Sequence, residues 1–181
     1  VVSGVPLHHN SSVAVGMQHQ EYIRKMHTHR VTQTAYTATG NAGSVGSGRI
    51  SFMYGFTGLS LAIDTACSSA FVALATVSCQ IKAETAFSGL SASANLILIP
   101  DTTGCINMAN MLAYDGRCKT LDMTASGYVR SEACNSTAIH SATAFPELRG
   151  VTLLAAQTNQ DGRSALITAP SGPRQTSLVT D

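Results

Sequence analysis

The segment from residue 59 to residue 81 constrains the fold of this chain more than any other. It begins with a short apolar run, Leu59 to Ile63, which predicts a buried strand. Asp64 and Thr65 interrupt the run, and either side chain is suited to cap a helix. From Ala66 to Ile81 the residues are small or apolar on every helical face, as in helices of protein interiors. The pattern predicts a strand, a tight turn and a buried central helix.

Cys67 lies in the first turn of this predicted helix, which makes it a candidate nucleophile. Unpaired backbone N–H groups and the helix dipole at that end stabilise an anion, so we expect the reactive thiolate to be favoured there. Most buried cysteines are inert. Polar residues nevertheless surround Cys67 in the sequence: Asp64, Thr65, Ser68 and Ser69. Cys79 occupies the middle of the same helix and is expected to be ordinary core.

Composition excludes several classes of protein. The chain has 181 residues, 44% of them hydrophobic, which suffices for one domain with a sizeable core. Eleven basic and ten acidic residues form no cluster, which argues against nucleic acid as a partner. No apolar run approaches the roughly 20 residues of a membrane span, and no secretion signal is recognisable. The five cysteines lack the spacing of a zinc site or a disulfide scaffold. We therefore expect reduced thiols and an intracellular location, in the cytoplasm or an organelle.

The rest of the chain alternates between patterns typical of strands and helices, which predicts a layered α/β core. The glycine-rich stretch from residue 40 to residue 48 fits neither nucleotide-loop pattern, and is expected to let a helix pack closely against the central helix. His19, His27 and His29 are expected on a solvated face, since no carboxylate or cysteine completes a metal site. The further expected elements are a strand at Ser12–Met17, a helix at Gln20–Met26, one or two buried strands within Ala86–Ile99, a helix at Thr103–Leu112 with Met108, Met111 and Leu112 facing inward, and strands at Thr137–His140 and Val151–Gln157.

The hexapeptide Asp64–Ser69, D-T-A-C-S-S, resembles the nucleophile motif of β-ketoacyl synthases, specifically the ketosynthase domains of type I polyketide synthases. Further segments resemble others of that family, in the same order and at similar spacing: Tyr36–Gly40 with Gly48–Ser51, Asp115–Asp122, Gly127–Arg130, and Asn159–Arg163 through Thr168–Pro170. The resemblance covers nearly the whole chain from about Val13 onward. It is therefore a specific signal.

The resemblance implies that residues 1–181 form the N-terminal half of a thiolase-like α/β fold, in which a buried central helix carries the nucleophile. Two family motifs with catalytic histidines, His-Gly-Thr-Gly-Thr and Asn-x-Gly-His, do not occur in this sequence. His140 is the only histidine after Cys67, and we expect it to be solvated. The chain is thus interpreted as a partial ketosynthase domain. A homodimer is expected, formed by the strand Leu59–Ile63 across a two-fold axis, and a half domain is expected to leave one core face bare.

The chemistry that the resemblance implies has two stages. The Cys67 thiolate takes an acyl group from the phosphopantetheine arm of an acyl carrier protein, and its backbone N–H stabilises the oxyanion. Decarboxylative condensation with a malonyl-type extender follows. Acyl and malonyl-type thioesters are the expected substrates, and neither a bound cofactor nor a metal is expected.

Three alternatives remain open. A fatty-acid-type β-ketoacyl synthase shares these motifs. A truncated, non-catalytic scaffold could also retain them. An unrelated cysteine hydrolase is a more distant hypothesis, since no histidine or asparagine constellation follows Cys67. The sequence also departs from the family pattern. Ser131 and Ala133 stand where the family usually has glycines, and are expected to be strained if the backbone there has positive φ. Asn135–Thr137 is polar where an apolar core strand is usual, which would cost stability if it were buried.

Overall fold

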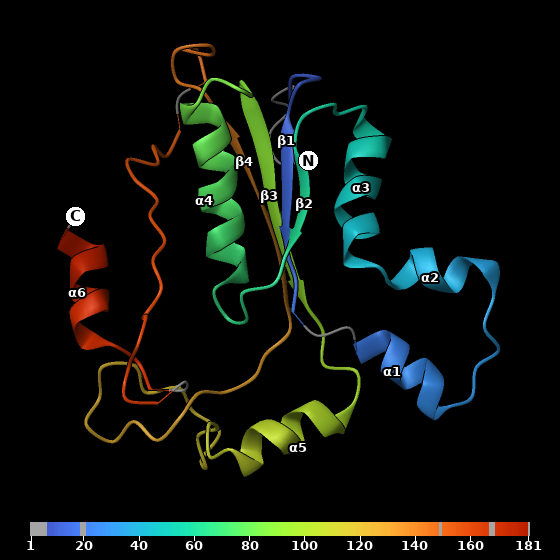
Figure 1. Ribbon diagram of the computed structural model, residues 1–181, viewed down its shortest axis with the longest axis vertical. Helices are drawn as coiled ribbons and strands as arrows, with labels where there is room; N and C mark the ends of the chain where they lie inside the picture. Colours follow the sequence, from blue (N-terminus) through green and yellow to red (C-terminus); the bar gives the residue numbers. More distant parts are fainter. Residues whose placement is uncertain (1–6, 19–20, 149, 167–168, 181) are drawn as a thin grey trace.

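The computed structural model describes residues 7–18, 21–148, 150–166 and 169–180, and these form a mixed α/β structure around one sheet (Figure 1). The strands are β1 (Ser12–Gly16), β2 (Ser60–Ile63), β3 (Ser88–Asn95) and β4 (Ala133–His140). The helices are α1 (Glu21–Thr28), α2 (Ala35–Asn41), α3 (Gly43–Tyr54), α4 (Ser69–Lys82), α5 (Pro100–Met108) and α6 (Gly172–Thr180). The expected α/β class is confirmed.

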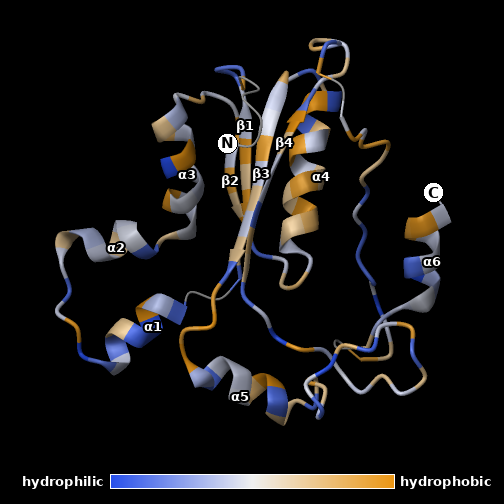
Figure 2. Cartoon of the chain, turned by 180° about the vertical axis from the view of Figure 1, so that it is seen from behind, coloured by the Kyte–Doolittle hydropathy of each residue, from blue (hydrophilic) through white to orange (hydrophobic). Residues whose placement is uncertain are grey.

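The strands are ordered β2-β1-β3-β4 across the sheet, so β1 and β3 lie inside it and β2 and β4 are its edges. The run Leu59–Ile63 forms a strand as predicted, but the predicted burial is wrong, because the edge strand β2 is mostly exposed. β1 pairs in parallel with both β2 and β3, whereas β3 and β4 are antiparallel. Helices cover the two faces: α4 packs against β1 and β3, and α3 packs against β2 and β1 on the opposite face (Figures 1 and 2). The core is built from small side chains, with Ala14, Ala73 and Val77 fully buried at its centre.

Two expectations about the central helix are corrected. α4 begins at Ser69 rather than before Cys67. It is also covered on one side only, because its small residues pack on the sheet while no described helix or strand packs on its other side. Phe71 is 76% exposed there, and Cys79 is exposed rather than ordinary core. Figure 2 shows the apolar character of α4, in contrast to the hydrophilic α1.

The glycine-rich stretch behaves differently from the expectation. It forms the end of α2 and the first half of α3, and α3 packs against β2 and β1 rather than against α4. The expected close packing of two helices is therefore wrong. The sheet lies between them (Figure 1).

The later part of the chain contains less regular structure than expected. The predicted strand Val151–Gln157 is wrong, since this stretch pairs with no described strand. α5 ends at Met108, and the side chains of Met108 and Met111 are 77% and 51% exposed rather than inward. No described strand or helix covers the stretch Val151–Gln157, so burial of its apolar side chains does not favour a regular strand there.

β4 is longer than the predicted Thr137–His140 and resolves the concern about its polar residues. Asn135–Thr137 lies on an edge strand and is exposed, so no burial cost arises. Ser93 donates a hydrogen bond across the ladder to Asn135 Oδ1 at 3.0 Å. Neither Ser131 nor Ala133 has a positive φ, so these two described residues do not carry the backbone strain that a positive φ would cause. Within the described ranges, no helix is long and apolar enough to cross a membrane.

Candidate functional site

Cys67 lies in the sharp turn between β2 and α4, with its side chain exposed. The polar residues around it build that turn. Asp64 Oδ1 accepts a hydrogen bond from the Ala66 N–H at 3.0 Å, and Ser68 Oγ donates to the Thr65 carbonyl at 2.7 Å. Among the described residues, no group accepts a hydrogen bond from the Cys67 N–H.

The residue before Cys67 has an unusual backbone. Ala66 adopts φ 55°, in the left-handed region that residues other than glycine seldom occupy. This conformation costs roughly 1–2 kcal/mol, and such outliers persist only where the surrounding structure enforces them. Here the enforcing bonds are those of Asp64 and of Ser69, whose N–H donates to the Ala66 carbonyl at 3.1 Å. The turn thus presents Cys67 from a strained, well-held backbone.

Gly16 brings the start of α4 onto the end of β1. A Cβ atom at Gly16 would lie 2.6 Å from the carbonyl carbon of Ser69, closer than real Cβ contacts. Gly16 pairs with Ile63 on β2 and with Ser93 on β3, so the carboxyl ends of three parallel strands meet beneath the Cys67 turn. Ligands of α/β proteins commonly bind outside the carboxyl ends of their strands.

A pocket of about 730 Å³ opens at this end of the sheet. Its size falls within the range of roughly 300–1,000 Å³ typical of small-molecule sites. Cys67 lies in its wall, and side chains from distant segments complete it. These include Met17, Ala70, Asn95, Ile106, Met111, Tyr128, Val129 and Arg130. The pocket is therefore mostly apolar, with a thiol and a few polar groups at its surface.

The wall from Tyr128 to Arg130 is the Gly127–Arg130 motif of the sequence. The Tyr128 N–H donates to the Met111 carbonyl at 3.1 Å, and the Tyr128 carbonyl accepts from the Ala113 N–H at 3.0 Å. The N–H of Val129 donates to Cys118 Sγ at 3.2 Å. These bonds close the loop from residue 113 to residue 128 and connect the Asp115–Asp122 motif to the pocket wall.

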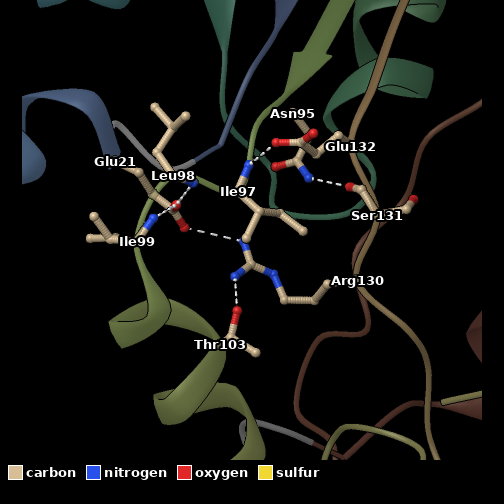
Figure 3. Close-up of polar contacts among 9 residues, drawn as sticks. All are labelled: Glu21, Asn95, Ile97, Leu98, Ile99, Thr103, Arg130, Ser131 and Glu132. Atoms are coloured by element: carbon tan, nitrogen blue, oxygen red, sulfur yellow. Dashed lines mark hydrogen bonds and ion pairs between the residues drawn. The ribbon is translucent and has the colours of Figure 1, made fainter.

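Glu21 and Arg130 form a buried ion pair behind this wall (Figure 3). Glu21 Oε1 lies 3.2 Å from Arg130 Nη2, and the two side chains are 2% and 8% exposed. Burial raises the pKa of Glu21, but hydrogen bonds from the Leu98 and Ile99 N–H groups and from Arg130 outweigh it and lower the pKa to about 2. The carboxylate is therefore ionised at every ordinary pH. Sequence reasoning missed Glu21, since no motif includes it.

Other predicted residues lie away from Cys67. His140 ends β4 and pairs with Ser88 at the start of β3, so it lies at the opposite end of the sheet. The expectation that it is solvated is wrong: it is partly buried, its ring meets Phe145 edge-on, and burial lowers its pKa. His27 and His29 are exposed as expected, while His19 falls outside the described residues. No group of potential metal ligands occurs within the described ranges.

Comparison with known families gives one match. The family model of the β-ketoacyl synthase N-terminal domain matches residues 4–142. Two curated relatives are large synthases. A phenolphthiocerol/phthiocerol polyketide synthase of Mycobacterium tuberculosis is 33% identical over 187 residues, covering 98% of this chain and 8% of the relative. The lovastatin nonaketide synthase mokA of Monascus pilosus is 35% identical over 173 residues, covering 94% and 6%.

Solved structures agree on the fold. The ketosynthase from module 6 of the bacillaene synthase of Bacillus subtilis 168 superimposes with a TM-score of 0.76 at 24% identity, covering 94% of this chain and 30% of that one. A mutant of the same ketosynthase gives a TM-score of 0.77 at 26% identity, covering 94% and 28%. The chain therefore spans under a third of these structures and under a tenth of the two curated relatives. The resemblance to polyketide ketosynthases and the thiolase-like fold are confirmed.

Proposed function

This chain belongs to the β-ketoacyl synthase family, and from that premise we propose that it is the nucleophile-bearing part of a polyketide synthase ketosynthase. Cys67 is proposed to accept an acyl group from the phosphopantetheine arm of an acyl carrier protein. The observation that carries the proposal is the placement of Cys67. A strained turn presents it to a mostly apolar pocket at the carboxyl ends of the parallel strands.

In the acylation step, the Cys67 thiolate attacks the carbonyl carbon of the acyl thioester and forms a tetrahedral intermediate. The free backbone N–H of Cys67 is the proposed donor to the oxyanion, where one such donor is worth roughly 3–4 kcal/mol. Collapse of the intermediate breaks the carbon–sulfur bond to pantetheine. The pantetheine sulfur leaves as a thiolate and takes up a proton equivalent to the one that the Cys67 thiol released, and Cys67 carries the acyl group as a new thioester.

Condensation with a malonyl-type extender makes further demands. The enolate formed by decarboxylation needs cationic or hydrogen-bonding groups, and in this chain His140 lies at the other end of the sheet. We therefore assign acylation to the described residues and condensation to the whole ketosynthase. The proposal includes no bound cofactor, since the substrate arrives on its carrier, and it includes an intracellular location.

The polyketide assignment rests on the names of the relatives and on how much of the chain they match. The two curated relatives are named as a polyketide synthase and a nonaketide synthase, and the match runs over nearly the whole chain. We propose polyketide intermediates as the acyl groups accordingly. The apolar side chains of Met17, Ile106 and Met111 suit an acyl chain better than a charged substrate.

Selective acylation tests the nucleophile. All five cysteines are exposed, so access to solvent alone cannot favour one of them. The chain is incubated with an acyl-pantetheine thioester, and the modified cysteine is located by mass spectrometry. We expect Cys67 to react at least about tenfold faster than any other cysteine, Cys67→Ser to remove this reaction, and Cys79→Ser to leave it intact. Equal modification of all five, or none at Cys67, would favour a scaffold without turnover.

A homodimer through β2 is the second part of the proposal. β2 is an edge strand, Leu61 is 40% exposed, and Phe52 and Met53 on the neighbouring α3 are 89% and 75% exposed. An apolar edge with free N–H and C=O groups is a template for pairing with another strand. The carbonyl of Ile63 faces β1, where it accepts from Met17 at 3.0 Å, so the N–H of Ala62 faces outward.

Ala62→Pro removes this outward donor without removing a bond to β1. Sedimentation velocity is expected to show a dimer for the unsubstituted chain and a monomer for Ala62→Pro. Ala62→Ser keeps the N–H and is expected to remain dimeric. A monomer in all three cases would contradict the dimer, and would leave the acylation proposal intact.

A further inference from the structure

The pocket exists partly because β3 and β4 separate at its edge. Their ladder pairs residues up to Asn95 and Ala133 and stops there. Beyond that point, side chains bridge the diverging backbones (Figure 3). Asn95 Nδ2 donates to the Ser131 carbonyl at 2.6 Å, and Glu132 Oε1 accepts from the Ile97 N–H at 2.8 Å. Hydrogen bonds made by side chains therefore replace the backbone hydrogen bonds of the ladder at this place.

Glu21 extends this bridging from a third segment. Its Oε2 accepts hydrogen bonds from the N–H groups of Leu98 at 2.7 Å and Ile99 at 3.2 Å, just before α5 begins. Its Oε1 pairs with Arg130, whose Nη1 donates to Thr103 Oγ1 in α5 at 2.6 Å. One carboxylate therefore connects α1, the turn into α5 and the irregular segment that leads to β4. Figure 3 shows Arg130 extended between Glu21 and Thr103.

Two of the segments that Glu21 connects, α5 and the segment that leads to β4, form walls of the Cys67 pocket. Val129, Arg130 and Ser131 line it from one side, and Ile106 of α5 lines it from another. Glu21 itself is absent from the lining and is 2% exposed. Its contacts set the distance between these walls without touching what the pocket holds.

We propose that Glu21 is a positioning residue for the Cys67 pocket, which holds Arg130 and the start of α5 at the separation that an acyl-pantetheine chain requires. This inference rests on the proposed acylation of Cys67. The Cys67 turn is held by its own bonds from Asp64, Ser68 and Ser69, and none of these involves Glu21. Loss of Glu21 should therefore alter the pocket but spare the thiol.

Two probes of Cys67 separate these effects in the full chain. Iodoacetamide is small and reports the reactivity of the thiol, whereas an octanoyl-pantetheine thioester must also occupy the pocket. In Glu21→Gln the amide cannot neutralise Arg130, so the buried guanidinium is expected to turn toward solvent and move the wall. We expect the rate of alkylation to stay within about twofold of the unsubstituted chain. Acylation is expected to fall at least about tenfold, mainly through a higher apparent KM.

Two further variants guard against an effect of misfolding. Thr103→Val is nearly isosteric and removes only the other contact of Arg130, so it should fold and slow acylation by about threefold. Asp115→Asn breaks the ion pair with Lys119, 2.7 Å long and outside the pocket lining, and should change neither probe. Circular dichroism checks the fold of each variant. Under the proposal, alkylation and acylation diverge only in the variants that release Arg130.

The outcomes are distinct. If Glu21→Gln and Thr103→Val are acylated like the unsubstituted chain, the positioning role is wrong and the proposed function stands. The same holds if alkylation and acylation fall together, because a general loss of structure then accounts for both. If the unsubstituted chain alkylates at Cys67 but is not acylated there, the proposed function fails, and the positioning role fails with it.

Discussion

The sheet with α4 and the peripheral segment, defined as residues 109–132 and 141–180, differ in how they are held together. In the first region, Val13 and Ala14 of β1 and Ala73 and Val77 of α4 are completely buried, and neighbouring strands share continuous ladders. In the peripheral segment, Leu121, Met123 and Val151 are fully exposed. The segment carries several family motifs but little regular structure. Several family motifs therefore lie in the part of this chain that has little regular structure, whereas the nucleophile motif joins β2 to α4.

The two regions meet at both ends of the sheet, and one of these meeting places is the pocket. The Tyr128–Met111 bond closes a loop within the peripheral segment, and the Glu21–Arg130 pair fastens the end of that loop to α1 and to the turn into α5. A site at such a junction takes its nucleophile from the stable region and its walls from the less stable one. Changes in the sheet should abolish the fold, whereas changes at the junction should lower the free energy of unfolding by an amount that depends on pH.

Gly89→Val is the change expected to have the largest effect on this comparison. A Cβ atom at Gly89 would collide with Val77 Cγ1 in the core and lie 2.9 Å from the Ser12 carbonyl oxygen of β1. Overpacking of this kind costs about 3 kcal/mol or more where backbone must move. We expect the cooperative urea transition, followed by circular dichroism, to be lost or to shift to much lower denaturant.

Gly48→Ala provides the matched control for Gly89→Val. Gly48 lies within α3, and an added Cβ would meet no atom within 4 Å. Alanine at this helical position should stabilise the chain by up to about 1 kcal/mol. A Gly89→Val chain as stable as the unsubstituted one would show that the sheet and α4 are packed more loosely than the structure indicates.

Much of the sheet region could be predicted from the sequence because its signals are local. The apolar run at Leu59–Ile63 and the small residues after it correctly indicate that a strand and a helix form here, although neither β2 nor α4 is buried as predicted. The start of α4 could not be placed, because it depends on the left-handed φ of Ala66, which alanine rarely adopts. Nor could the exposure of Cys79, since an apolar helix carries no sign of whether a second layer covers it.

The candidate site was only partly predictable for the same reason. Cys67 and the Gly127–Arg130 wall belong to recognisable motifs, and the structure brings both to one pocket. Glu21 could not be identified, because its partner Arg130 is 109 residues away in the sequence. The predicted strand at Val151–Gln157 failed because a strand needs a neighbour, and no described strand pairs with it.

Acid denaturation offers a smaller, sharper test of the junction between the two regions. The pKa of Glu21 is lowered to about 2 from the ordinary 4.5, so its ionised form stabilises the folded state. This contribution is complete above about pH 4.5, declines as the unfolded chain protonates below that value, and is gone near pH 2. The difference in pKa corresponds to a contribution on the order of 3 kcal/mol.

Comparing the unsubstituted chain with Glu21→Gln isolates this contribution, because the lowered pKa values of His140, Asp115 and Asp122 affect both chains equally. The difference in unfolding free energy, measured by urea titration at several pH values, should be largest at pH 5–7 and shrink toward pH 2. Asp115→Asn breaks a solvent-accessible pair, and its difference should be far smaller at every pH. A Glu21→Gln difference that does not vary with pH would mean that the ionised carboxylate contributes nothing at the junction, and that Arg130 is held by its packing alone.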